Sequence, residues 1–152
     1  MGQAALTKDN SPADDIGELD GILGFHIRLA HGAVYRHFTE TFAELGLTQK
    51  QVSTLWLVDD HPGIAQIEVG QRLRMDRATT MTIVNRLQDR DYLRRERSES
   101  DGRKQSLHLT PAGARALGQA KQCIDSHEAW LKSRFSENEI EKLVEMLSRI
   151  HE

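Results

Sequence analysis

The sequence predicts a mainly helical α+β protein with one small β-hairpin. Apolar residues recur at steps of three or four over most of the chain, which is the period of an amphipathic helix. An alternating pattern, typical of strands, is confined to residues 93–110. With 152 residues, the chain is about the size of one domain, or of a small domain that carries additional dimerisation helices.

A long helix is predicted near the amino terminus. Residues 1–15 contain few large apolar side chains and show no period, so we expect a flexible tail there. From Ile16 the helical period continues to about Leu45, and Gly46 provides a C-terminal stop. A long helix with an apolar stripe at a chain end usually packs against a partner or another long helix.

Three shorter helices are predicted next. Thr48 and Gln51 have the spacing of a capping box, and the helix that they begin breaks at the His-Pro-Gly sequence of residues 61–63. A short helix follows, and Asp76 is a suitable N-cap for a further helix that continues to about Arg90. Two short helices joined by a tight turn indicate a helix-turn-helix motif.

The alternating residues 93–110 predict a β-hairpin with a polar, basic tip, because turn-forming residues occupy positions 98–102. Thr110 and Pro111 then provide an N-cap and a proline at the first position of a long helix. A second capping box, at positions 136–139, begins the last helix. A hairpin directly after a helix-turn-helix is a β-wing, so we expect a winged helix-turn-helix core.

The formal net charge of −3 is unevenly distributed along the chain. Residues 72–104 contain ten cations, nine of them arginine, against six anions, a local net charge of +4, while the remainder carries −7. Arginine suits bidentate contacts with phosphate and guanine, so the local charge favours a DNA-binding surface on the winged segment. A mixed-charge, solvated face is the alternative explanation. The total charge excludes only a histone-like polycation.

The predicted helix from Arg77 to Arg90 is the expected recognition helix. At 100° per residue, Met81, Val84 and Gln88 fall on the packed side, with Thr80 and Leu87 toward it. The opposite face combines Thr79, Thr82, Ile83, Arg86 and Arg90. Hydroxyls and arginines there suit base edges or phosphates, and Ile83 suits a thymine methyl group. An ordinary amphipathic helix with an arginine-rich exterior is the alternative. The residues expected in the major groove are Arg77, Ala78, Thr79, Thr82, Ile83 and Arg86.

Several segments resemble the multiple-antibiotic-resistance regulator (MarR) family. They are residues 67–87, Leu93-Arg94-Arg95, Asp101-Gly102-Arg103-Lys104 and Leu107-His108-Leu109-Thr110-Pro111-Ala112-Gly113. The most specific elements are the Asp-x-Arg of the hairpin and the closing Leu-x-Leu-Thr-x-x-Gly. The helix order resembles the family over about residues 16–150. Members of this family are dimeric winged-helix transcription factors, so the resemblance implies a homodimer on a pseudo-palindromic operator in double-stranded DNA.

The resemblance also implies a division of the chain. Residues 16–46 and 111–152 would hold the dimerisation helices, and residues 47–110 the winged helix-turn-helix DNA-binding domain. At the wing, Arg103 would reach the minor groove with Lys104 beside it, and Asp101 would pair with a nearby arginine to hold the shape of the wing. A narrow minor groove attracts arginine through its enhanced negative potential.

Two positions depart from the family pattern. Asp91 stands where relatives usually have glycine, and aspartate tolerates a left-handed backbone better than most residues. Gly70 replaces a usual alanine in a helix, at a cost of up to about 1 kcal/mol of helix propensity. Neither change removes a DNA-contacting group.

Many family members bind small phenolic or anionic ligands between the dimer helices and the winged core. In this chain Phe25, His26, Arg28 and Trp56 would offer aromatic walls and cationic groups to an effector. Such a set suits an aromatic carboxylate or its thioester, and we expect a repressor that this effector releases from DNA. Ordinary core aromatics beside a surface charge are the alternative explanation.

Other chemistries have less support in the sequence. His26, His31 and His37 share one helix without a metal-ligand pattern, and the single cysteine, Cys123, is expected to be a packed, inert thiol rather than a peroxide sensor. We therefore expect no metal and no cofactor. The absence of a phosphate loop, a His-Glu-x-x-His motif or a Gly-x-Ser-x-Gly motif argues against an enzyme.

The remaining alternatives are a small-molecule-processing enzyme and a winged-helix protein-interaction module that does not bind DNA. The arginine-bearing groove face argues against the interaction module. The longest apolar runs are only a few residues, and a basic-then-apolar leader is lacking, so we expect a cytoplasmic protein with no membrane association.

Overall fold

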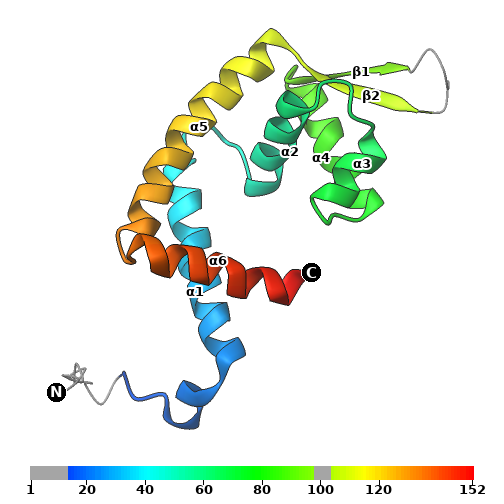
Figure 1. Cartoon of the computed structure of the whole chain (residues 1–152). Helices are drawn as coiled ribbons and strands as arrows, with labels where there is room; N and C mark the ends of the chain where they lie inside the picture. The colour runs from blue at the N-terminus through cyan, green and yellow to red at the C-terminus, as the bar shows by residue number, and fades with distance from the viewer. Residues whose placement is uncertain (1–13, 98–103) are drawn as a thin grey trace. The chain divides into compact units, whose positions relative to one another are not determined.

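The computed structural model in Figure 1 describes residues 14–97 and 104–152. The chain forms two compact units, Met1–Arg36 and His37–Glu152. The described part of the first unit contains a short 3-10 helix, η2 (Gly17–Gly21), and most of helix α1 (Leu23–Thr41), whose last turn belongs to the second unit.

The second unit contains the elements of a winged helix-turn-helix. In chain order they are α2 (Gln49–Asp60), α3 (Gln66–Arg72), α4 (Arg77–Asp89), β1 (Leu93–Arg97), β2 (Gln105–Leu109), α5 (Pro111–Lys132) and α6 (Glu137–His151). Figure 1 shows α2, α3 and α4 grouped together, with the two antiparallel strands extending from them. A mainly helical fold with one β-hairpin is therefore confirmed.

The first helix is shorter than predicted. Instead of one helix from residue 16 to Leu45, the chain forms η2, passes through an extended residue at Ile22, and ends α1 at Thr41. Glycines at positions 17 and 21 favour the break, because glycine has a low helix propensity. Gly46 adopts a φ of +59°, so the left-handed stop is present, but turn residues separate it from the helix.

The predicted caps begin the helices of the second unit. The backbone N–H of Gln51 donates to Thr48 Oγ1 at 3.2 Å, and the backbone N–H of Thr48 donates to Gln51 Oε1 at 3.0 Å, which completes the capping box of α2. Ser136 and Glu139 form the same reciprocal pair at the start of α6. Each cap satisfies backbone donors that a helix leaves without partners, so these helix starts follow from local sequence.

The wing is anchored on both edges of β2. Leu93 pairs with Leu109 and Arg95 with Leu107 across the hairpin. On the other edge, Leu107 O accepts from the Gly63 N–H at 2.9 Å, and the Leu107 N–H donates to Ile64 O at 2.9 Å. The loop between α2 and α3 therefore pairs with β2 through an isolated antiparallel bridge, Ala65 with Ser106, which attaches the root of the wing to the helix-turn-helix.

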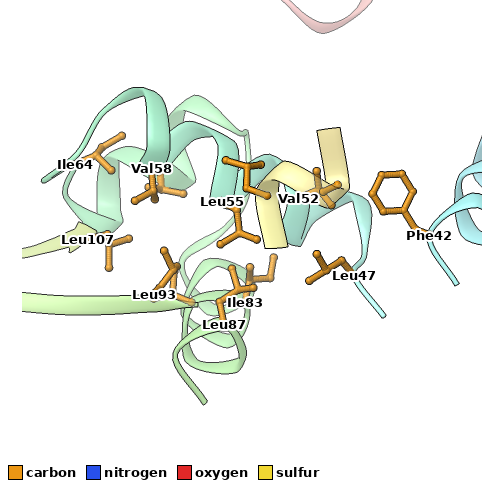
Figure 2. Close-up of a cluster of buried hydrophobic side chains, with 14 of the residues drawn as sticks. Phe42, Leu47, Val52, Leu55, Val58, Ile64, Ile83, Leu87, Leu93 and Leu107 are labelled. Carbon is orange, nitrogen blue, oxygen red and sulfur yellow. The ribbon is translucent and has the colours of Figure 1, made fainter. Parts of the chain in front are cut away.

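One apolar core connects α2, α4 and the wing. Figure 2 shows Leu55 of α2, Leu87 of α4, and Leu93 and Leu107 of the hairpin in a single cluster, and each is at most 1% exposed. Burial of a leucine side chain contributes about 1.5–3 kcal/mol. Because these elements share one core, the recognition helix and the root of the wing keep a fixed relative position.

The closing motif of the hairpin holds the start of α5 against the turn after α4. The Thr110 N–H donates to Tyr92 O at 3.1 Å, and the Thr110 hydroxyl donates to Asp91 O. A Cβ at Gly113 would lie 2.0 Å from Tyr92 O, so only glycine fits this approach. Asp91 itself has a φ of +60°, which confirms the left-handed backbone expected where relatives carry glycine.

Gly70 of α3 lies directly against Thr80 of α4. A Cβ at this position would come within 2.8 Å of Thr80 Oγ1 and 3.2 Å of Met75 O. Thr80 is buried, and its hydroxyl donates to Asp76 O at 2.8 Å, so it cannot move aside easily. Because glycine has no Cβ, α3 and α4 can pack this closely. This close packing compensates for the low helix propensity of glycine.

Candidate nucleic-acid interface

Helix α4 begins with a tightly held N-cap. Asp76 Oδ1 accepts from the Thr79 N–H at 2.7 Å, and Oδ2 accepts from the Thr79 hydroxyl at 3.0 Å. The backbone hydrogen bond from Thr79, followed by the hydroxyl hydrogen bond, lowers the pKa of the Asp76 carboxyl. The cap therefore stays ionised and orients the first turn of the helix.

The two threonines of the predicted groove face use their hydroxyl protons within the helix. The Thr79 hydroxyl donates to Asp76, and the Thr82 hydroxyl donates to Ala78 O at 3.0 Å. A hydroxyl has one proton and two acceptor lone pairs, so both residues keep only acceptors for a ligand. In a major groove, acceptors match the amino groups of adenine and cytosine and do not match phosphate.

The exposed side of α4 carries cations without internal partners. Arg77, Ala78, Thr82 and Arg86 are exposed, and Thr79 is half-buried. Neither the Arg77 nor the Arg86 side chain forms a hydrogen bond or an ion pair with any residue that the structure describes. These guanidinium groups are available for phosphate or guanine.

The prediction for Ile83 is wrong. Ile83 is 7% exposed and packs beside Leu87 in the core, as Figure 2 shows, so it does not lie on the groove face. The buried stripe of α4 runs through Thr80, Ile83, Val84 and Leu87, while Met81, expected on the packed side, is 53% exposed. The stripe of α4 that its neighbours cover is therefore displaced from the stripe that the sequence predicts. As a result, Asn85 is exposed near Thr82. Sequence reasoning missed Asn85, although its spacing of three from Thr82 was a usable signal.

Arg90 also departs from its predicted place on the groove face. Its Nη1 donates to Gly46 O at 2.8 Å and its Nη2 to Leu45 O at 3.1 Å. The guanidinium carbon lies 4.7 Å from the centre of the Tyr92 ring. Arg90 therefore caps the turn that follows α1, a structural task that leaves few donors for DNA.

Only part of the predicted wing contact is described. Lys104 is exposed at the start of the return toward β2. Asp101 and Arg103 lie outside the described residues. On β1, Arg94 forms an ion pair with Glu96, whose second carboxylate oxygen lies 3.4 Å from His108 Nε2.

The predicted effector residues belong to both units. In the first unit, the Phe25 and His26 rings meet edge to face at 5.8 Å, and the Arg28 guanidinium carbon lies 5.1 Å from the Phe25 centroid. In the second unit, Trp56 is half-buried, and Lys121 Nζ lies 4.8 Å above its ring. Sequence reasoning missed Lys121, which only the packing of α5 on α2 brings to the indole.

The histidines include one close pair. His37 Nδ1 and His127 Nδ1 are 2.8 Å apart, and the Trp130 ring stacks on His37 with a centroid distance of 3.9 Å. Burial, followed by the charge of His37, lowers the pKa of His127. Cys123 is a half-buried free thiol. Within the described ranges, no group of three or more His, Cys, Asp or Glu residues is placed to hold a metal ion.

A membrane-spanning helix was not expected. Among the residues that the structure describes, no helix combines the length and the apolar character needed to cross a bilayer.

The chain is similar to proteins of known class. The sequence profile of the MarR family matches residues 45–104. The transcriptional repressor CouR, solved on a 23-mer DNA duplex, is 32% identical with a TM-score of 0.86, over 91% of this chain and 98% of that chain. A second CouR structure, bound to p-coumaroyl-CoA, is 30% identical with a TM-score of 0.81, over 90% and 96% of the two chains. A transcriptional regulatory protein for the hcr operon of Thauera aromatica is 29% identical over 136 residues, 89% of this chain and 82% of that protein.

These comparisons confirm the resemblance, the fold class and the functional class expected from the sequence. The similarity extends beyond the winged core into the flanking helices, since it covers nine-tenths of the chain. The class consists of regulators and not of enzymes, which agrees with the lack of a catalytic motif. The chain belongs to the MarR family and is a DNA-binding transcriptional regulator with a winged helix-turn-helix fold.

Proposed function

We propose that this protein is a homodimeric repressor that binds a pseudo-palindromic operator and is released by an aromatic carboxylate or its thioester. The observation that carries the proposal is the similarity, at 30–32% identity over nine-tenths of the chain, to a repressor solved both on DNA and with p-coumaroyl-CoA. Repression of transcription requires access to genomic DNA, which favours a cytoplasmic protein.

Operator reading is proposed for α4 and the wing. Arg77 and Arg86 supply unpaired cations, and Thr79 and Thr82 supply acceptors in the first turns of the helix, beside the exposed Ala78. For the minor groove we propose Arg103 and Lys104, with Asp101 holding the shape of the wing. Contacts of these kinds combine phosphate positioning with readout of base edges.

A homodimer is supported by apolar residues that the single chain leaves exposed. Val144, Leu147 and Ile150 of α6 are 60%, 42% and 63% exposed, and none of the α6 residues is buried. In the first unit, Ile22 and Leu23 are likewise exposed. Such a concentration of exposed apolar groups indicates an interaction surface. We propose residues 16–46 and 111–152 as dimerisation regions on either side of a DNA-binding domain at 47–110.

The effector class is supported by residue chemistry. An aromatic acyl thioester of coenzyme A offers a ring for stacking and phosphates for cations. Phe25 with His26 and Arg28 supplies rings and a cation in the first unit, and Trp56 with Lys121 supplies a ring and a cation in the second. An effector acts only if it binds the DNA-free arrangement of the dimer more tightly than the DNA-bound one.

Fluorescence anisotropy of a labelled duplex, selected by the protein from a randomised library, tests this function. We expect p-coumaroyl-CoA or a related aromatic acid to weaken binding, whereas free coenzyme A leaves it unchanged. Arg28→Gln removes one proposed cation and is expected to raise the effector concentration needed for release without altering DNA affinity. If none of a series of aromatic acids and thioesters shifts the binding curve, the effector assignment is wrong while DNA binding stands.

A further inference from the structure

We propose that Arg95 of β1 is a positioning residue that joins the wing to the recognition helix and orients the amide of Asn85 for reading the major groove. This inference rests on the proposed role of α4 in operator reading. Neither the charge pattern nor the family resemblance singled out Arg95 or Asn85 for such a task.

Arg95 makes four hydrogen bonds to side chains of two other elements. Nε and Nη2 both donate to Gln66 Oε1 of α3, at 3.2 and 3.0 Å. Nη2 also donates to Asn85 Oδ1 of α4 at 2.7 Å, and Nη1 donates to Gln88 Oε1, one turn further along the same helix. A single guanidinium thus connects the first strand of the wing to both helices of the helix-turn-helix.

These contacts leave Arg95 little capacity to bind DNA itself. A guanidinium has five N–H donors, and four of the hydrogen bonds it can make go to protein amides. The side chain is half-buried, unlike its exposed neighbours Arg94 and Arg97 on the same strand. Within the described part of the chain its hydrogen-bond partners are neutral amides, and it forms no ion pair with a carboxylate.

The contact has a direct consequence for Asn85. A guanidinium has no acceptor, so the amide must direct Oδ1 toward Arg95, and its NH₂ group lies on the opposite branch. Asparagine reads adenine through both atoms, accepting from N6 and donating to N7. Because the Oδ1 branch is directed toward the wing, the exposed Asn85 presents its NH₂ donors outward, and these match acceptors such as guanine O6 and N7 or thymine O4. Arg95 therefore biases base preference without contacting the base.

Selection from a randomised duplex library tests the proposal, with wild type, Arg95→Gln, Asn85→Ala and Arg97→Gln compared. Arg97→Gln is the matched control, because it removes the same charge from the same strand at an exposed residue whose side chain makes no hydrogen bond or ion pair with a described residue. On the duplex selected by wild type, we expect Arg95→Gln to lose at least about tenfold in affinity, as for one hydrogen bond to a charged group.

Two readouts distinguish positioning from direct contact and from simple destabilisation. The slope of log affinity against log salt concentration should stay at the wild-type value in Arg95→Gln, since a lost phosphate contact would reduce it by about 0.9. The selected base preference should change at one position per half-site in both Arg95→Gln and Asn85→Ala. In the double variant the two losses should be less than additive.

Several results would overturn the proposal. Wild-type affinity and base preference in Arg95→Gln would show that the network has no role in reading DNA. A reduced salt slope would make Arg95 a phosphate contact. Additive losses of affinity in the double variant would show that Arg95 and Asn85 act independently. If Arg95→Gln fails to fold, Asn85→Ala, an exposed substitution, still decides whether that amide sets a base preference. A wild-type chain that enriches no duplex contradicts the proposed operator reading itself, and the inference falls with it.

Discussion

The winged core and α6 differ in where their apolar side chains lie. In the core, leucines from α2, α4 and the hairpin are at most 1% exposed and complete one cluster within a single chain. In α6, Val144 and Ile150 remain more than half exposed, although the helix is capped and regular. Local sequence specifies both regions equally well, but only the first buries its apolar surface.

The winged core and α6 therefore suit different tasks. A surface that reads DNA must be rigid, and a closed core beneath α4 and the wing provides that rigidity from one chain. A helix with an exposed apolar face gains stability only when another surface covers it. We therefore expect core substitutions to act on folding, and substitutions in α6 to act on assembly.

The largest expected effect is a loss of stability in the core. Leu87→Ala should lower the free energy of unfolding by about 2–5 kcal/mol, because it removes a fully buried side chain shared by the helix and the wing. Urea denaturation followed by circular dichroism measures this loss. A change below about 1 kcal/mol would show that the core tolerates a cavity, and it would contradict the contrast between the closed core and α6.

A charged substitution in α6 is expected to act on assembly instead. Leu147→Asp places a carboxylate on the apolar face and should weaken the dimer by at least about 2 kcal/mol, as for a central interface residue. Sedimentation velocity across a range of protein concentrations measures the dissociation constant. Glu141→Gln, at an exposed polar position of the same helix, is the control and should leave the dimer intact. An unchanged dimer in Leu147→Asp would refute the proposed role of α6.

The DNA surface should respond without any change in folding. Arg86→Ala is expected to cost about 1–3 kcal/mol of operator affinity if this guanidinium reads a base. Its side chain is exposed and has no partner among the described residues, so the thermal stability should stay near that of wild type. Anisotropy on the selected duplex and on a scrambled duplex measures both affinities. An equal loss on the two would make Arg86 a phosphate contact.

The smallest expected effect is a pH dependence from the buried histidine. Burial and the neighbouring His37 lower the pKa of His127 in the folded state, so the unfolded chain binds more protons below about pH 6.5. Stability should therefore fall as the pH drops through 6.5, by at most about 1.4 kcal/mol per pH unit, and level off below the folded pKa. The charge of Glu128 raises the pKa of His127 and so opposes this effect. Unfolding measured between about pH 7.5 and pH 5.5 should show a smaller slope in His127→Gln.

Much of the fold could be predicted because the signals are local. The capping pairs Thr48 with Gln51 and Ser136 with Glu139 act within one turn, and the structure contains both. The left-handed backbone at Asp91 was expected from the family resemblance, because relatives usually have glycine at this position. The end of α1 at Thr41 was not expected, because several weak preferences compete along residues 42–46.

The candidate site was predicted less completely. Arg77, Thr82 and Arg86 are exposed as expected, but a helical wheel could not tell which stripe of α4 its neighbours would cover. Ile83 is buried because α4 packs into a core built from segments on both sides of it in the sequence. Met81 is exposed for the same reason.

The sequence by itself determined where most helices begin, where the hairpin lies, and that the charge of the winged segment favours DNA. These properties depend on residues within a few positions of one another. Only the tertiary structure decided that Arg90 caps a distant turn, that Gly70 permits the approach of Thr80, and that Arg95 gathers amides from two helices. Those contacts join residues 7 to 45 positions apart, so tertiary packing, and not local periodicity, selects their partners.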